Sequence, residues 1–218
     1  MLALGAGARS KVHFETKIGL PWANVRLHVP IITNPGATLM IDDVVHRWQP
    51  GSFWFGDFSR WHQVANDGDQ VRIHLIIDSF LTADLLKLFP RSFLDRLSGD
   101  DVLFIRPEVP VADLRPYRCA FDVPVAFTDW EEADGEFLLP QPTVRVAVEA
   151  AGGRLVLTVG RSPRFALTHV GDGEFRFAGW TEERTIQILP GGAGVVLRTR
   201  QGRSVRELTV PVAGSTPR

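Results

Sequence analysis

Short apolar segments separated by tight turns run through most of this chain and restrict it to a β-rich fold. Beyond Tyr117 eight such segments follow one another, with glycine pairs such as Gly152-Gly153 between them. Segments of this kind between turn signals are typical of strands. Their even, short spacing predicts an antiparallel meander that curls into an open or closed barrel. The expected strands are 118–126, 142–150, 154–160, 163–170, 174–179, 184–190, 194–200 and 203–210.

The amino-terminal part of the chain reads as a second group of strands. In residues 25–33, Arg26 and His28 alternate with Leu27 and Val29, so one face of this strand is polar and the other apolar. The alternation alone allows the polar face to point into a barrel or into solvent. Residues 70–78 repeat the pattern, with Arg72, His74 and Ile76 on one side and Val71, Ile73, Leu75 and Ile77 expected to face a core.

Further strands complete this group. Residues 37–41 and 44–48 flank Asp42-Asp43 and predict a hairpin, although the turn lacks the glycine that favours the tightest connections. Residues 52–57 and 62–66 are expected to form a strand pair. About seven strands before residue 80 are enough for a double-stranded β-helix, the cupin-like jelly roll.

Between these groups the apolar spacing changes to that of helices. Leucines and phenylalanines recur at helical intervals over residues 82–97 and are interrupted by Pro90, which predicts two short helices capped by Thr82 and Ser92. Residues 99–116 are rich in proline and aspartate and read as a linker. We therefore expect an all-β protein with a jelly-roll domain at 1–81, a helical connector and linker at 82–116, and an antiparallel β-barrel-like domain at 117–218.

Composition limits where the protein works and what it binds. A net charge of −1 without a basic block provides no electrostatic footprint for nucleic acid or an acidic membrane surface. The single Cys119 permits no internal disulfide, which favours a reducing compartment. The opening MLALGAGARS has too short an apolar run for a signal peptide, and no stretch approaches membrane-spanning length. We expect a cytoplasmic protein.

Two histidines and a glutamate in the first part of the chain suggest a metal site. His13 and Glu15 share one face if their segment is extended, and His62 follows in a later strand. Two imidazoles and a carboxylate are the ligands of the non-haem Fe(II) facial triad, which leaves positions open for a co-substrate and oxygen. The competing interpretation is that His13 and Glu15 are solvated strand residues.

An arginine after the last candidate ligand suggests a partner for that metal. The planar guanidinium of Arg72 can bind the far carboxylate of a keto-diacid such as 2-oxoglutarate through two hydrogen bonds. It can also form an ordinary surface ion pair with Asp69 or Asp57, which would contribute little stability.

Three segments of residues 25–78 resemble a known family. They are similar to the aspartyl/asparaginyl β-hydroxylase family of 2-oxoglutarate oxygenases, and they read VRLHVPIITNPG, WQPGSFWFGDFSRWHQVANDGD and QVRIHLIID. The resemblance covers roughly residues 1–80. It implies that the polar faces of the strands point into the pocket. Family members usually carry a longer segment before the first ligand. The resemblance therefore also implies that elements covering the substrate are missing here.

The resemblance assigns roles to individual residues. It implies that His13, Glu15 and His62 hold the metal, with Glu15 in the place where many members have the shorter Asp. It also implies that Arg26, His28 and Arg72 contact the carboxylates of 2-oxoglutarate. For His28 a second function stays open, because it can replace Glu15 as a ligand if that carboxylate does not reach the metal.

The function implied is hydroxylation of an aliphatic carbon in an amino acid or a peptidyl Asp/Asn-type side chain, with Fe(II), 2-oxoglutarate and molecular oxygen. Two alternatives remain. One is a degenerate oxygenase-fold protein that binds a ligand or partner without turnover, and the other is a cupin-like metal protein whose isomerase or dioxygenase chemistry needs no 2-oxoglutarate.

Some residues have no assigned role. His74 lines the pocket or is a satisfied core histidine, and His46 and His169 have no predicted partner. Trp54 or Trp61 can wall the substrate pocket, although aromatic residues more often belong to a core. The second domain weakly resembles small lipocalin-like β-domains, and we expect it to support the fold, cover the substrate or form a homodimer.

Overall fold

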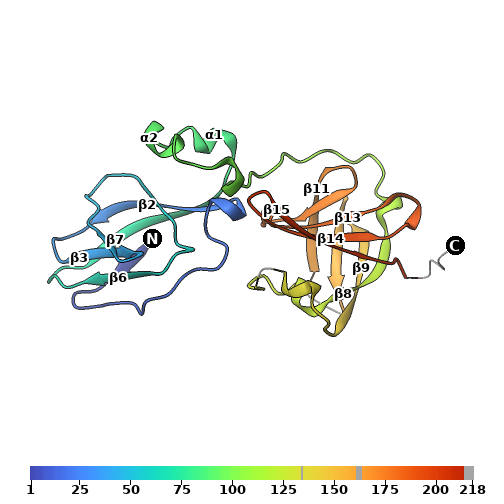
Figure 1. Cartoon of the computed structure of the whole chain (residues 1–218), viewed down its shortest axis with the longest axis horizontal. Coiled ribbons are helices and arrows are strands. Elements are labelled where there is room, and N and C mark those ends of the chain that lie inside the picture. Colours follow the sequence, from blue (N-terminus) through green and yellow to red (C-terminus); the bar gives the residue numbers. More distant parts are fainter. Residues whose placement is uncertain (134, 161–163, 214–218) are drawn as a thin grey trace. The chain divides into compact units, whose positions relative to one another are not determined.

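The computed structural model describes residues 1–133, 135–160 and 164–213, and in it the chain forms two compact units (Figure 1). The first unit is Met1–Asp95 and the second is Arg96–Arg218. Both consist mainly of antiparallel strands with a few short helices, which confirms the all-β character of the fold. None of the helices in the described ranges is long and apolar enough to span a membrane.

The first unit contains two antiparallel sheets. In the four-stranded sheet the order is β1-β7-β2-β5, and in the three-stranded sheet it is β4-β3-β6. The bounds are β1 Leu2–Leu4, β2 Asn24–Ile32, β3 Ala37–Ile41, β4 Val44–His46, β5 Trp54–Gly56, β6 His62–Asn66 and β7 Arg72–Phe80. Leu39, Trp48 and Phe58 form a buried cluster in this unit.

The hairpin predicted at Asp42-Asp43 is present. Ile41 pairs with Val44, so two residues form the turn between β3 and β4. Both aspartates adopt left-handed backbone conformations, with φ of 45° and 63°. This pair of positive φ values matches the twist of the flanking strands, and aspartate tolerates it better than most non-glycine residues.

His28 of β2 and Arg72 and His74 of β7 are buried, whereas part of the apolar face of β7 is exposed. His28 and Arg72 are only 3% and 2% exposed. By contrast, Val71, Leu75 and Ile77 are 40%, 36% and 38% exposed, so the expectation that these three side chains face a core was wrong. The interior of this unit therefore contains polar and charged side chains beside its apolar ones, and such side chains are uncommon in a core that only stabilises the fold.

Part of the outer face is covered by the helical connector. Helices α1 (Ala83–Leu86) and α2 (Arg91–Leu94) follow β7, and Phe55 of β5 lies 5.3 and 6.0 Å, between ring centroids, from Phe89 and Phe93. The side chain of Thr82 accepts a hydrogen bond from Leu85 N at 3.0 Å, which confirms the predicted cap. The predicted Ser92 cap was wrong, because α2 begins at Arg91 after Pro90 and Ser92 lies inside its first turn.

The second unit is one eight-stranded antiparallel sheet that nearly closes into a barrel, in the order β15-β14-β13-β12-β11-β10-β9-β8. The segment after β15 returns to β8, where Ala213 N donates to Ala120 O at 2.6 Å. The eight predicted strands are all found, although residue 163, at the start of one of them, lies outside the described residues. Their bounds are β8 Cys119–Pro124, β9 Thr143–Ala151, β10 Arg154–Val159, β11 Arg164–Gly171, β12 Glu174–Phe177, β13 Arg184–Ile188, β14 Val195–Gln201 and β15 Ser204–Val210.

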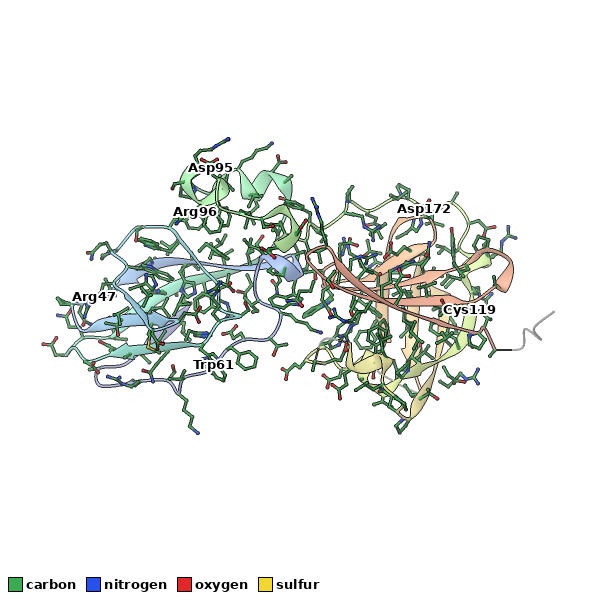
Figure 2. All side chains as sticks on the ribbon, viewed as in Figure 1. Arg47, Trp61, Asp95, Arg96, Cys119 and Asp172 are labelled. Carbon is green, nitrogen blue, oxygen red and sulfur yellow. The ribbon has the colours of Figure 1, made fainter. Side chains whose placement is uncertain are left out.

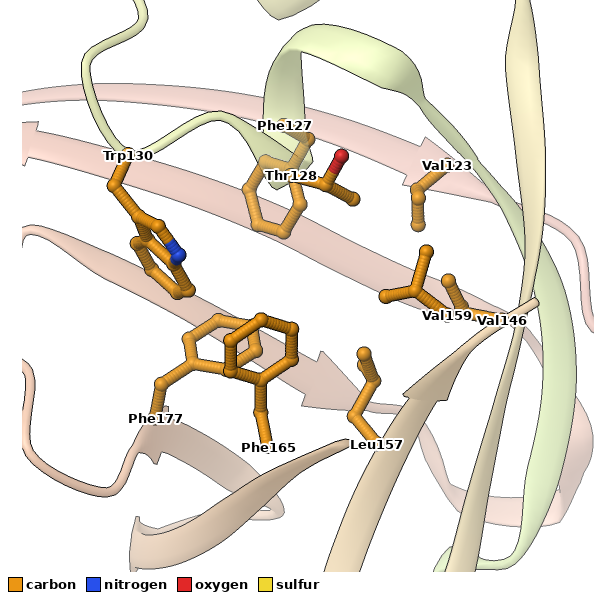
Figure 3. A pocket seen from close by; sticks show the side chains of 9 residues that line it. All are labelled: Val123, Phe127, Thr128, Trp130, Val146, Leu157, Val159, Phe165 and Phe177. Atoms are coloured by element: carbon orange, nitrogen blue, oxygen red, sulfur yellow. The ribbon is translucent and has the colours of Figure 1, made fainter. Parts of the chain in front are cut away.

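The interior of this barrel is apolar. A cavity of only about 10 Å³ lies at Phe127 and Leu157, and Figure 3 shows its lining. Trp130 lies against Phe165 and Phe177 with edge-to-face rings, at centroid separations of 5.5 and 4.9 Å. Packing of this kind stabilises the barrel.

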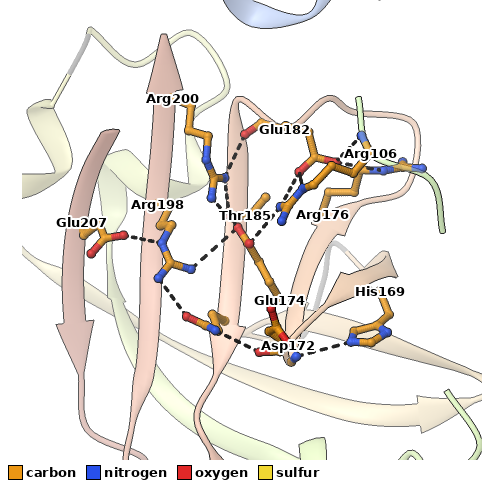
Figure 4. A network of polar contacts seen from close by, with 12 residues as sticks. Arg106, His169, Asp172, Glu174, Arg176, Glu182, Thr185, Arg198, Arg200 and Glu207 are labelled. Atoms are coloured by element: carbon orange, nitrogen blue, oxygen red, sulfur yellow. Dashed lines mark hydrogen bonds and ion pairs between the residues drawn. The ribbon is translucent and has the colours of Figure 1, made fainter. Parts of the chain in front are cut away.

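An ion network attaches residues of the expected linker to the barrel (Figure 4). Arg106 pairs with Glu174 and Glu182 at 2.8 and 2.6 Å. Burial acts to raise the pKa of Glu174, but hydrogen bonds from Thr185, Arg200 and Arg106 and the charge of Arg200 outweigh it and lower that pKa to about 2. The carboxylate of Glu174 is therefore ionised at neutral pH, and this part of the linker is held in place.

Candidate metal centre

His13, Glu15 and His62 converge in the first unit. One ligand atom from each of them lies within 4.8 Å of those of the other two. His13 and His62 form an antiparallel bridge, in which His13 N donates to His62 O at 3.0 Å and His62 N donates to His13 O at 2.7 Å. Glu15 follows two residues later, and its backbone N donates to Phe58 O at 2.9 Å. The three residues can hold a single metal ion.

Backbone carbonyls fix both imidazoles in a form suited to metal binding. Nδ1 of His13 lies 2.9 Å from Lys11 O, and Nδ1 of His62 lies 2.9 Å from Arg60 O. A carbonyl only accepts, so each Nδ1 carries the proton and each Nε2 keeps its lone pair for a metal. Burial, the largest influence, lowers the pKa of His62, which favours its neutral, ligating form.

The third candidate ligand is engaged by Arg26. Nη1 of Arg26 donates to Glu15 Oε2, while Nε and Nη2 donate to Asp78 at 2.6 and 2.9 Å. Burial acts to lower the pKa of Arg26, but the hydrogen bonds and charges of Asp78 and Glu15 outweigh it and raise that pKa. All three guanidinium nitrogens thus have carboxylate partners. The contact of Arg26 with 2-oxoglutarate stays a prediction.

A second polar cluster is formed by Arg72, His74 and His28. Arg72 Nη2 donates to His74 Nδ1 at 2.9 Å, and His28 Nδ1 lies 3.4 Å from the same atom. In the described part of the chain, Arg72 Nη1 and His28 Nε2 are buried without a hydrogen-bond partner. A buried polar atom left unpaired costs about 1–3 kcal/mol, so these two atoms indicate a place for a polar ligand.

Burial sets the charge of this cluster. It is the main cause that lowers the pKa of His28 to about 3 and that of His74 to about 4, and the positive charge of Arg72 acts in the same direction. Burial also lowers the pKa of Arg72 to about 10. At neutral pH both imidazoles are therefore neutral and Arg72 is charged, so the cluster presents one cation, which favours an anionic ligand.

A narrow hollow adjoins Arg72 and His74. Its volume is about 10 Å³. Trp48 stacks on Trp54 and on His74, with ring centroids 5.4 and 6.2 Å apart. The other residues that line the hollow are Thr33, Ala37, Thr38, Leu39 and His46.

Phe58 connects the two clusters. Its ring lies 4.9 Å from that of His62, edge to face, and 4.9 Å from that of His28, stacked. Phe58 is 3% exposed and belongs to the buried cluster of this unit. The candidate metal ligands and the cluster with the two unpaired polar atoms are thus separated by one aromatic ring.

Trp61 lies outside the interior of this unit. It is 56% exposed and packs edge to face on Phe14 at a centroid separation of 4.9 Å (Figure 2 labels Trp61). Both residues adjoin candidate ligands in sequence, and alternation along the extended chain directs their side chains away from the side of His13 and His62. Trp54 is the tryptophan that stacks against the lining of the hollow.

The buried imidazoles predict a loss of stability in mild acid. His28 and His74 bind a proton near pH 6.5 in the unfolded chain but only near pH 3 and 4 in the folded one. Below pH 6.5 the unfolded state therefore holds more protons, and the free energy of unfolding falls by up to about 1.4 kcal/mol per pH unit for each imidazole. Urea unfolding of the wild type and of His74→Gln at pH 7 and pH 5 measures this. We expect the variant to lose about 2 kcal/mol less than the wild type. If His74→Gln loses as much unfolding free energy between pH 7 and pH 5 as the wild type, the lowered pKa of His74 is contradicted. His46→Gln serves as the control.

The fold and the site together define a class: a mostly antiparallel β-protein with a His–Glu–His cluster that can bind a metal ion. The family model of aspartyl/asparaginyl beta-hydroxylase matches residues 8–81, which confirms the resemblance of the first unit to that family. The matched segment contains both clusters described above and suggests a hydroxylase-type function. No curated protein matches the chain.

Proposed function

We propose that this protein is an Fe(II)/2-oxoglutarate-dependent dioxygenase that hydroxylates an aliphatic carbon of an amino acid or of a peptidyl Asp/Asn-type side chain. The observation that carries the proposal is the convergence of His13, Glu15 and His62 within one ring of two buried, unpaired polar groups. The proposal includes the double-stranded β-helix as the fold of the first unit and a cytoplasmic location.

The donor set fits Fe(II). His13 and His62 would ligate through Nε2, because their Nδ1 atoms are held by backbone carbonyls. Glu15 would supply one carboxylate oxygen. Two imidazoles and a carboxylate leave coordination positions open, and bound iron would supply the oxidation chemistry with 2-oxoglutarate and molecular oxygen.

Arg72 and His28 fit the co-substrate. The Nη1 group of Arg72 is a charged donor without a partner among the described residues, and a carboxylate would satisfy it. The lone pair left on His28 Nε2 can accept a hydrogen bond from a bound water. Arg26 is a weaker candidate for this contact, because three of its five N–H groups already donate to Glu15 and Asp78.

Aromatic side chains would exclude water from the site. Phe58 is 3% exposed and packs against His28 and His62. Trp48 is 7% exposed and packs against His28 and His74. An apolar wall lowers the local dielectric, so the charge of Arg72 acts more strongly on a bound carboxylate than it would in water.

One observation favours a second candidate. The pairing of Glu15 with Arg26 already satisfies this carboxylate without a metal, which is also expected of a degenerate member that binds a ligand without turnover.

Anaerobic titration with Fe(II) and then 2-oxoglutarate tests the proposal. We expect a visible absorption band from Fe(II) chelated by the keto acid, followed by formation of succinate when oxygen and a suitable amino acid or peptide are added. Fe(II) binding without the band would support the cupin-like alternative, and a folded protein that binds the keto acid without turnover would support the degenerate one.

A further inference from the structure

Arg26 makes two kinds of carboxylate contact at once. Toward Asp78 it presents Nε and Nη2, which meet both oxygens of that carboxylate at 2.6 and 2.9 Å in a bidentate pair. Toward Glu15 it presents the remaining nitrogen, Nη1, which donates to Oε2 alone. The guanidinium therefore connects an anchoring carboxylate to a candidate metal ligand.

The sheet itself sets this arrangement. Arg26 of β2 lies directly opposite Asp78 of β7 in the antiparallel register, so the bidentate pair joins two neighbouring strands. The side chain of Arg26 is 16% exposed, and its guanidinium lies 5.8 Å from the centre of the Phe58 ring. A planar guanidinium held by the opposite strand and by an aromatic ring has few alternative positions, so it can fix the position of a carboxylate that it binds.

We propose that Arg26 is a positioning residue that fixes Glu15 as a one-oxygen metal ligand, and that Asp78 orients Arg26 for this role. The inference rests on the proposed metal site. Arg26 donates to Oε2 of Glu15, so Oε1 is the oxygen that has no guanidinium partner and would serve as the single ligand atom. Hydrogen bonds to the outer oxygen of a ligating carboxylate are a common means of orienting metal ligands.

The length of the glutamate gives this contact its importance. Glutamate has one more rotatable bond than aspartate, and ordering it for metal binding costs more conformational entropy. A hydrogen bond from a fixed arginine removes that freedom before the metal arrives. This role differs from the one that the family resemblance implies for Arg26, because three of its five N–H groups already donate to Glu15 and Asp78 and two carboxylates balance its charge.

A charge argument separates positioning from simple electrostatics. Arg26 is a cation beside the candidate site of a divalent ion, so removing its charge should strengthen metal binding if electrostatics alone mattered. If Arg26 positions Glu15, removing it should weaken metal binding. The two effects have opposite signs.

Calorimetric titration of the full chain with Co(II) tests the proposal in the wild type, Arg26→Met, Arg26→Lys and Asp78→Asn. We expect Co(II) binding to weaken about 10- to 100-fold in both Arg26 variants, the range typical of lost contacts to a metal ligand, and to weaken less in Asp78→Asn. The visible Co(II) bands of the Arg26 variants should also change, because they report the number and geometry of the ligands. Arg9→Met is the matched control, because Arg9 also pairs with both oxygens of a carboxylate of this unit, Asp67, which is not a candidate ligand.

Each outcome is decisive. Equal or tighter Co(II) binding with unchanged bands in the Arg26 variants, while the wild type binds Co(II), would overturn the role of Arg26 and leave the proposed function intact. Failure of the wild type to bind Co(II) would overturn both. If the Arg26 variants do not fold, unchanged affinity and bands in Asp78→Asn would overturn the proposal, and weakened binding with altered bands would support it.

Discussion

Replacing His62 by alanine should nearly abolish metal binding. His62 is 2% exposed, its Nδ1 is held by Arg60 O, and its Nε2 is the donor that the site would use. Loss of a direct ligand should lower Fe(II) or Co(II) affinity by more than the roughly 10–100-fold that follows the loss of a group acting through a ligand. Anaerobic Fe(II) titration measures the change.

The control for this variant is His169→Ala. His169 lies in the second unit, where its Nδ1 donates to Val109 O at 2.9 Å, so it should leave metal affinity unchanged. Thermal unfolding of both variants shows whether the fold is retained. If folded His62→Ala binds Fe(II) as tightly as the wild type, the candidate metal centre is wrong.

Replacing Arg72 by methionine should abolish 2-oxoglutarate binding and leave metal binding nearly intact. Arg72 is 2% exposed, and its Nη1 group is the unpaired cation that a carboxylate would satisfy. Removing one partner of a buried charged hydrogen bond costs roughly 2–5 kcal/mol, which is more than about thirtyfold in affinity. Anaerobic calorimetry with the Fe(II)-loaded protein measures both affinities.

The same variant should fold at least as well as the wild type, because it replaces a buried, incompletely paired charge by an apolar side chain of similar length. Arg47→Met is the control, because Arg47 is exposed in the same unit. Unchanged affinity for 2-oxoglutarate in Arg72→Met would refute the co-substrate role. Loss of metal binding as well would indicate that Arg72 supports the whole site.

Local sequence signals predicted most of the strands. The eight strands of the second unit follow from alternating apolar residues and glycine turns, because both signals act over a few neighbouring residues. The hairpin at Asp42-Asp43 and the cap at Thr82 are local in the same sense. The Ser92 prediction failed because Pro90, two residues earlier, suits the start of a helix and sets its boundary first.

The direction of the faces could not be predicted from alternation. A period of two separates Leu75 and Ile77 from Arg72 and His74 but does not say which set is buried. The apolar set is partly exposed here, since the polar set faces the interior. Only the family resemblance favoured that orientation.

The sequence by itself determined the β-rich architecture and the approximate positions of most strands, because these depend on residue type and short spacing, and its resemblance to a family singled out the candidate ligands. Tertiary structure decided which residues meet. The pairing of Arg26 with Asp78 depends on the register between β2 and β7, and Phe58 reaches both His62 and His28 through contacts distant in sequence. Such contacts follow from how strands pair and pack, and neither is specified by the spacing of residues along the chain.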